Sequence, residues 1–182
     1  NIARRWPLCM PYDPNGYMME GMELLELEKG GTTQDQKDWF TQQLQFTFEP
    51  IKDWHITVNG SMQTYSYNQH REVLPVQAYD INQNPYYTSN GDYGAGVSYI
   101  YEYRMKQDYF TLNAFTDYSK QLGDHWFKVM AGFNAELTKQ NEMSGSGRSL
   151  TSINVPSLNQ TTANKSVSAS RAENSLAGFF GR

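Results

Sequence analysis

The chain has 182 residues, a formal net charge of −4 at pH 7 and a mean hydropathy of −0.70, and 14% of its residues are aromatic. It contains no apolar run long enough for a transmembrane helix, which argues against a helical membrane protein. The small net charge is dispersed and forms no basic stripe, so a nucleic-acid-binding surface is not expected.

Residues 1–33 are predicted to form a loop segment that precedes the first strand. Within it, Asp13-Pro-Asn-Gly is a strong turn signal. The run from Met18 to Leu27 fits either a short amphipathic helix or an irregular loop, because periodicity alone does not separate the two. Cys9 is the sole cysteine of the chain, so neither an intrachain disulfide nor a cysteine metal cluster is expected.

Residues 34–68 are predicted to form a β-hairpin. The break between its two strands lies at residues 50–53, where a strand-ending proline is followed by the turn-favouring Asp53. On both sides of the break apolar and polar side chains alternate with a period of two, as in a strand with one apolar and one polar face. The apolar positions are Phe40, Leu44, Phe46, Phe48, Trp54, Ile56, Val58 and Met62.

Residues 98–140 repeat this pattern and are predicted to form a second hairpin, with its turn at residues 120–124. Phe115 is the one large apolar residue on its polar side. The apolar positions are Phe110, Leu112, Ala114, Tyr118, Phe127, Val129, Ala131, Phe133, Ala135 and Leu137. Residues 173–182 are predicted to begin a next strand.

The length of the alternating runs favours a membrane-spanning sheet. Ordinary strands have about 5–6 residues, whereas a tilted strand that crosses a bilayer needs about 9–11. The predicted fold class is therefore all-β, a segment of an antiparallel transmembrane β-barrel whose apolar face meets lipid and whose polar face lines the lumen. A soluble β-sandwich has the same alternation, with the apolar face turned toward a core.

The connections between strands support the barrel. The two turns are short, while residues 69–97 and 141–172 are predicted to be loops well beyond the length of about 12–15 residues that is already uncommon in compact domains. Outer-membrane barrels have short periplasmic turns and long extracellular loops. We therefore expect residues 1–33, 69–97 and 141–172 to be extracellular, and Trp54 and Trp126 to lie at the periplasmic interface.

No signature of an enzyme or a metal site stands out. The chain lacks a Gly-x-Ser-x-Gly elbow and a glycine-rich phosphate loop that opens a helix. His55, His70 and His125 are dispersed and have no partner at metal-ligand spacing. We predict no catalytic residues, no metal and no cofactor.

Four runs of residues carry a resemblance to a known family. They are Ala3-Arg-Arg-Trp-Pro-Leu, Met10-Pro-Tyr-Asp-Pro-Asn-Gly, Phe127-Lys-Val-Met-Ala-Gly-Phe-Asn-Ala-Glu and Ala177-Gly-Phe-Phe-Gly-Arg. The last two are the most specific, because they combine strand alternation with particular glycine positions. Together the runs resemble the SusC/RagA family of TonB-dependent outer-membrane transporters of Bacteroidota.

The resemblance implies a plugged barrel of about 22 strands, of which this chain would supply about five as an internal piece. It also implies a SusD-like surface lipoprotein as partner, and energy delivered by TonB, ExbB and ExbD through N-terminal parts that lie outside this chain. The cargo of such transporters is an oligosaccharide or a peptide. The location implied is the bacterial outer membrane.

Substrate-binding residues are the least specified part of the prediction. Tyr79, Tyr86, Tyr87 and Tyr93 lie in the predicted loop 69–97, and tyrosine rings are suited to stack on sugars while their hydroxyl groups form hydrogen bonds. Packing within the loop, or contact with the lipoprotein, is the alternative for each of them. Two rival functions stay open, a TonB-dependent receptor for siderophores or cobalamin, and a soluble glycan-binding β-sandwich or adhesin.

Overall fold

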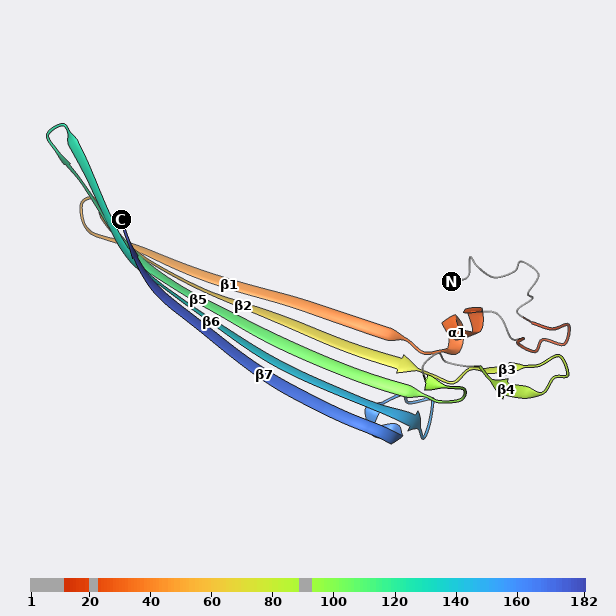
Figure 1. Cartoon of the computed structure of the whole chain (residues 1–182). Helices are drawn as coiled ribbons and strands as arrows, with labels where there is room; N and C mark the ends of the chain where they lie inside the picture. The colour runs from red at the N-terminus through yellow and green to blue at the C-terminus, as the bar shows by residue number, and fades with distance from the viewer. Residues whose placement is uncertain (1–11, 20–22, 89–92) are drawn as a thin grey trace. The chain divides into compact units, whose positions relative to one another are not determined.

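The computed structural model describes residues 12–19, 23–88 and 93–182, which form a mainly antiparallel β structure (Figure 1). Five long strands make one sheet in the order β1-β2-β5-β6-β7, so strands that follow one another along the chain lie side by side. Their bounds are β1 Thr33–Ile51, β2 Trp54–Val73, β5 Tyr99–Leu122, β6 His125–Leu150 and β7 Thr161–Gly181. The predicted all-β class and antiparallel sheet are confirmed.

The smaller elements lie in the connections between these strands. A seven-residue helix α1, Glu23–Lys29, precedes β1. The strands β3, Gln77–Tyr79, and β4, Pro85–Tyr87, form a separate antiparallel hairpin after β2. A single 3-10 turn, η3, covers Leu158–Gln160 before β7. No helix in the described residues is long and apolar enough to cross a membrane.

Two tight turns join the strands of the predicted hairpins, as the sequence indicates. Asp53 has φ of 68° and its backbone N–H donates a hydrogen bond to Glu49 Oε1 at 3.0 Å. Gly123, with φ of 62°, occupies the left-handed region in the turn between β5 and β6. This region favours glycine and tolerates aspartate, which explains why the chain reverses at these two places.

The chain divides into two compact units, each of which contains part of all five long strands. Unit 1 consists of Asn1–Gln36, Asn68–Arg104 and Met143–Ser168, and it holds α1, β3, β4 and the connections around them. Unit 2 consists of Lys37–Tyr67, Met105–Glu142 and Ala169–Arg182, and it holds both tight turns.

The sheet in unit 2 has one polar and one apolar face. On the polar face, hydrogen bonds between side chains cross three strand boundaries. They join Thr47 to Thr57 at 3.5 Å, Ser61 to Thr111 at 2.6 Å, and Asn134 Nδ2 to Asn113 Oδ1 at 2.6 Å. The residues predicted on the polar side of each strand therefore lie on the same face of the sheet.

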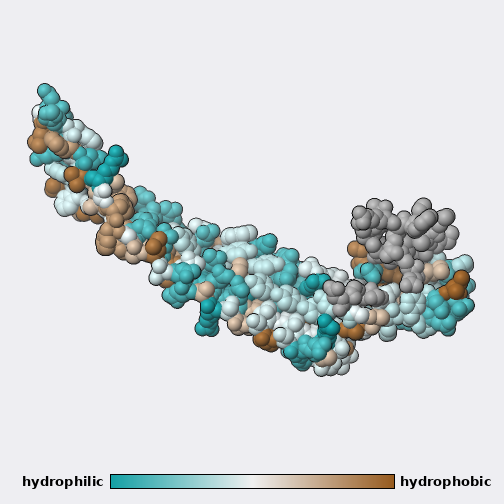
Figure 2. All heavy atoms as spheres, viewed as in Figure 1, coloured by the Kyte–Doolittle hydropathy of each residue, from teal (hydrophilic) through white to brown (hydrophobic). Residues whose placement is uncertain are grey.

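The apolar face of unit 2 is exposed. Leu44 retains 69% of its accessible surface and Phe46 71%, and Leu112 and Phe127 retain 45% and 53%. Figure 2 shows hydrophobic residues gathered toward the tight turns. No second layer formed by the described residues packs on this face, so the core that a soluble β-sandwich requires is not formed within them.

The buried apolar cluster of the described residues lies instead in unit 1. Leu25 of α1 is packed with Val76 and Ala78, and all three are at most 3% exposed. Met18 and Tyr86 pack against this group. The proposed helix within Met18–Leu27 is thus present from Glu23 onward, while residues 20–22 lie outside the described part of the chain.

Two predicted loops differ from the structure. β6 continues to Leu150 and β7 begins at Thr161, so a short connection, residues 151–160, replaces the predicted loop 141–172, and the strand expected at 173–182 begins much earlier. In the other loop, residues 69–73 belong to β2 and the hairpin β3–β4 interrupts the remainder.

The strands are longer than predicted because backbone hydrogen bonds extend them into segments whose side chains do not alternate between apolar and polar. Residues 141–150 are mostly small or polar and do not alternate, yet Ser149 N–H donates to the Ser98 carbonyl oxygen at 3.0 Å. Leu150 N–H donates to Ser98 Oγ at 2.7 Å. Hydrogen bonds of the main chain do not depend on which side chains are attached.

Candidate functional site

The four tyrosines predicted to contact substrate have different environments. Tyr79, in unit 1, contacts the segment that precedes α1. Its ring lies 4.9 Å from that of Tyr17, with 54° between the planes. Its backbone N–H donates to the Met18 carbonyl oxygen at 2.9 Å. These contacts hold the segment before α1 against β3, which fits the alternative of packing within the loop.

Tyr86 and Tyr87 lie on β4. Tyr86 packs against the buried cluster of Leu25, Val76 and Ala78. Tyr87 is 52% exposed, and its ring covers Gly96, where a Cβ atom would lie 3.2 Å from Tyr87 Cδ2. Tyr86 therefore packs within unit 1, whereas about half of the Tyr87 surface is accessible to solvent.

Tyr93 is the predicted residue that contacts both aromatic and cationic side chains. Its ring stacks on that of Tyr99, with centroids 4.4 Å apart and planes inclined by 20°. The Cζ atoms of Arg71 and Arg148 lie 6.0 Å and 5.5 Å from the Tyr93 ring centroid, within the range of cation–π attraction. We call Arg71, Tyr93, Tyr99 and Arg148 the Tyr93 cluster.

The sheet positions the members of the Tyr93 cluster. Arg71 comes from β2, Tyr99 from the first residue of β5 and Arg148 from near the end of β6. The hydrogen bonds that Ser98 accepts from Ser149 and Leu150 align the start of β5 with the end of β6. Residues from three adjacent strands therefore meet, although they are far apart in the sequence.

Sequence reasoning missed both arginines. The signal available was weak, since Arg71 and Arg148 each stand in a polar stretch that the pattern assigns to loops. Their proximity depends on the alignment of β2, β5 and β6, which no local pattern reveals. The chemistry they bring is specific, because a guanidinium group is planar, stays charged and offers several N–H donors to carboxylate or phosphate oxygens.

A second polar group in unit 1 surrounds His70 and borders a cavity of about 370 Å³. His70 Nδ1 lies 2.6 Å from Glu102 Oε1, and His70 Nε2 lies 3.7 Å from Glu72 Oε2. Thr32 Oγ1 donates to Glu72 Oε1 at 2.9 Å. Arg104 also lines the cavity.

A hollow of about 430 Å³ lies on unit 2, lined by aromatic and amide side chains. Trp39 stacks on Tyr65 with centroids 4.8 Å apart, and Tyr109 Oη donates to Glu136 Oε2 at 2.9 Å. These side chains suit neutral polar ligands. Among the residues that the structure describes, no group of three or more His, Cys, Asp or Glu residues is placed to hold a metal ion.

Comparison with known proteins gives a match in structure. No protein-family model matches the chain, and no curated protein matches it. The fold is similar to chains in structures described as the RagAB peptide transporter, with a TM-score of 0.72 and 14% identity, and as the RagAB peptide importer in its open-open state, with 0.72 and 13%. For the closed-closed state of that importer the TM-score is 0.73 and the identity 14%.

The similarity extends over most of this chain. It covers 94% of the chain in all three comparisons, but 19% of the other chain. At such low identity the match establishes the fold, which is that of about one fifth of a RagAB transporter chain.

Proposed function

We propose that the chain is part of a TonB-dependent outer-membrane transporter that imports oligosaccharides or peptides together with a SusD-like lipoprotein. The observation that carries the proposal is the exposed apolar face of unit 2 on long antiparallel strands. Apolar side chains that are left uncovered by protein favour a lipid environment, and a bilayer is the environment for which strands of this alternation are suited.

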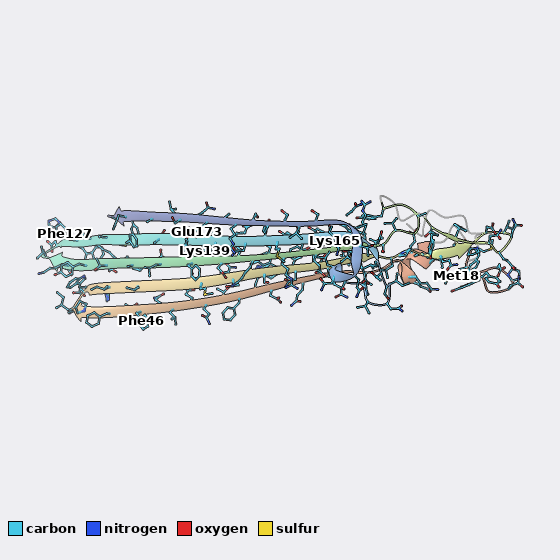
Figure 3. All side chains as sticks on the ribbon, turned by 90° about the horizontal axis from the view of Figure 1, so that it is seen from below. Met18, Phe46, Phe127, Lys139, Lys165 and Glu173 are labelled. Carbon is cyan, nitrogen blue, oxygen red and sulfur yellow. The ribbon has the colours of Figure 1, made fainter. Side chains whose placement is uncertain are left out.

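The boundary of that apolar face supports the proposal. Thr64 Oγ1 donates to Asp108 Oδ1 at 2.7 Å, and Lys106 Nζ lies 3.2 Å from Asp108 Oδ2. On the two strands that follow, Lys139 Nζ lies 3.7 Å from Glu173 Oε1. Figure 3 shows Lys139 and Glu173 on adjacent strands, with Phe127 much nearer the tight turns. On these strands the charged residues follow the apolar positions of unit 2, as expected near the edge of a hydrocarbon layer.

In this role the tight turns at Asp53 and Gly123 would be periplasmic. The connections before β1, between β2 and β5 and between β6 and β7 would be extracellular, close to cargo and lipoprotein. Cargo too large for a general pore would be held there until TonB-driven movement of the plug opens the lumen. The structures with a similar fold are described as a peptide transporter and a peptide importer, which supports the transport class.

The proposal assigns no catalysis to the chain. In this role the residues of the lumen and loops bind, orient and release cargo. Neither a covalent step nor a cofactor is required, since the energy for transport comes from outside the barrel.

The experiment that tests the proposal deletes the gene in its host and measures uptake of fluorescent oligosaccharides and peptides, each class in a neutral and an acidic form. It also includes purification of the tagged full-length protein from outer membranes. We expect loss of uptake of one cargo class and co-purification of a surface lipoprotein. Retention of uptake of both classes, or recovery of the protein in a soluble fraction, would contradict it.

The same experiment separates the two rival functions. Defective siderophore or cobalamin uptake without a lipoprotein partner would assign the chain to a lidless receptor. Recovery from the soluble fraction with bound glycan would assign it to a soluble β module, which the exposed apolar face of unit 2 already disfavours.

A further inference from the structure

We propose that the Tyr93 cluster is a binding site for a carboxylate group of the cargo. The inference rests on the proposed transport function and deepens it, because it names the chemical group that the cargo presents. Acidic side chains of a peptide and uronic acid units of an oligosaccharide both carry this group.

Arg71 and Arg148 bring positive charge to the ring of Tyr93. Two guanidinium groups approach one tyrosine ring, at 6.0 Å and 5.5 Å from its centroid. Among the described residues, none of the ion pairs within 4.0 Å includes Arg71 or Arg148. An anion bound beside this ring would be attracted by both guanidinium groups.

The guanidinium groups of the Tyr93 cluster keep N–H donors for a ligand. A guanidinium group in a cation–π contact still has N–H groups along its edges, and these match the two oxygens of a carboxylate. The Tyr93 and Tyr99 rings are stacked and so keep their positions.

The Tyr93 cluster is accessible to solvent. Arg71 is exposed, and Tyr93, Tyr99 and Arg148 are half-buried, so the cluster is open to solvent but held in place by its neighbours.

The His70 group of the same unit provides the contrast. There Glu102 and Glu72 already supply carboxylates to His70, at 2.6 Å and 3.7 Å. Arg104 lines that cavity together with Glu102, whereas no ion pair within 4.0 Å among the described residues includes Arg71 or Arg148. Arg104 is therefore the matched control, since its removal changes the net charge of unit 1 by the same amount per residue.

The test measures binding by the full-length protein in detergent, using two pairs of probes. One pair is an end-blocked pentapeptide that contains two glutamates and its glutamine counterpart. The other is trigalacturonic acid and its methyl ester. Isothermal titration calorimetry gives Kd for each probe with the wild type, with R71Q/R148Q and with R104Q, and heat-modifiable migration on gels verifies that each variant is folded.

We expect the wild type to bind the acidic member of one pair about tenfold or more tightly than its neutral counterpart, as for charge-assisted hydrogen bonds. R71Q/R148Q should lose that preference while binding the neutral member as before, and R104Q should keep it. The pair that shows the preference identifies the source of the carboxylate. Added salt should reduce the preference in the wild type.

Equal binding of acidic and neutral members by the wild type, absence of binding of either acidic probe, or an unchanged preference in R71Q/R148Q would overturn the inference. These failures differ from failure of the proposed function. Uptake of neutral cargo that is lost on gene deletion would preserve the transporter while removing the carboxylate site.

Discussion

The two units use the same five strands in different ways. In unit 2 the apolar side chains of one face, such as Phe46 and Leu112, are exposed, and the other face carries polar hydrogen bonds. In unit 1 the apolar side chains of the connections are packed on one another around Leu25, and charged groups are exposed. Apolar side chains are therefore buried by protein in unit 1, whereas those on one face of unit 2 are not covered by the described residues. Four predictions test this contrast.

The largest expected effect is in the buried cluster of unit 1. Leu25→Ala should destabilise the packing of α1 on β3 by about 2–5 kcal/mol, because Leu25 is 3% exposed and its removal leaves a cavity. Hydrogen exchange of the backbone amides of residues 76–79 measures the loss. Leu27→Ala on the same helix is the control, since Leu27 is 66% exposed and should have little effect. Similar exchange in the two variants would show that Leu25 is not part of a core.

The next effect separates the two faces of unit 2. Leu112→Arg in the full-length protein should lower the free energy of unfolding from lipid vesicles by about 2–4 kcal/mol, because a charge would enter the hydrocarbon. Asn113→Arg, on the polar face, should be tolerated better, although it loses the hydrogen bond with Asn134. Urea titration followed by tryptophan fluorescence measures both. Equal tolerance at the two sites would remove the case for a lipid-facing surface.

A smaller effect concerns the packing on the polar face of unit 2. A Cβ atom at Gly132 would collide with the ring of Phe180, whereas nothing lies within 4 Å of one at Gly178. Gly132→Ala should therefore cost about 1–3 kcal/mol from overpacking. Gly178→Ala should leave stability almost unchanged. The same urea titration compares them, and a Gly132→Ala protein as stable as the Gly178→Ala protein would show that the Phe180 ring moves aside freely.

The smallest effect is a pH dependence in the turn between β3 and β4. Hydrogen bonds from the side chain and backbone N–H groups of Asn84, and then from Asn82 N–H, hold the pKa of Asp80 below its ordinary value of 3.8. A carboxyl group with a lowered pKa stabilises the folded turn above pH 3.8. That stabilisation is lost as the pH falls through the lowered value.

The pKa of Asp80 can be followed through the chemical shifts of its side-chain carboxyl carbon. In Asn84→Ala the pKa should rise toward the ordinary value, because the side-chain hydrogen bond at 3.1 Å is removed. Identical titration curves for the two proteins would mean that this hydrogen bond does not form in solution.

The sequence predicted much of unit 2 and little of the candidate site. The alternation of residues such as Phe46 and Thr47, together with the turn at Asp53, was sufficient for two hairpins, because strand faces and tight turns are local properties. The ends of β6 and β7 were misassigned, because their small and polar residues do not alternate while their backbones still pair. The role of Tyr93 in binding carboxylate stays a prediction.

By itself, the sequence determined the strand periodicity, the positions of both tight turns and the apolar character of one face. The tertiary structure decided how far each strand extends and which distant residues meet. Arg71, Tyr93 and Arg148 come together through the alignment of β2, β5 and β6. The physical reason is that side-chain patterns act over a few residues, whereas the alignment of strands is set by backbone hydrogen bonds between segments that are distant in the chain.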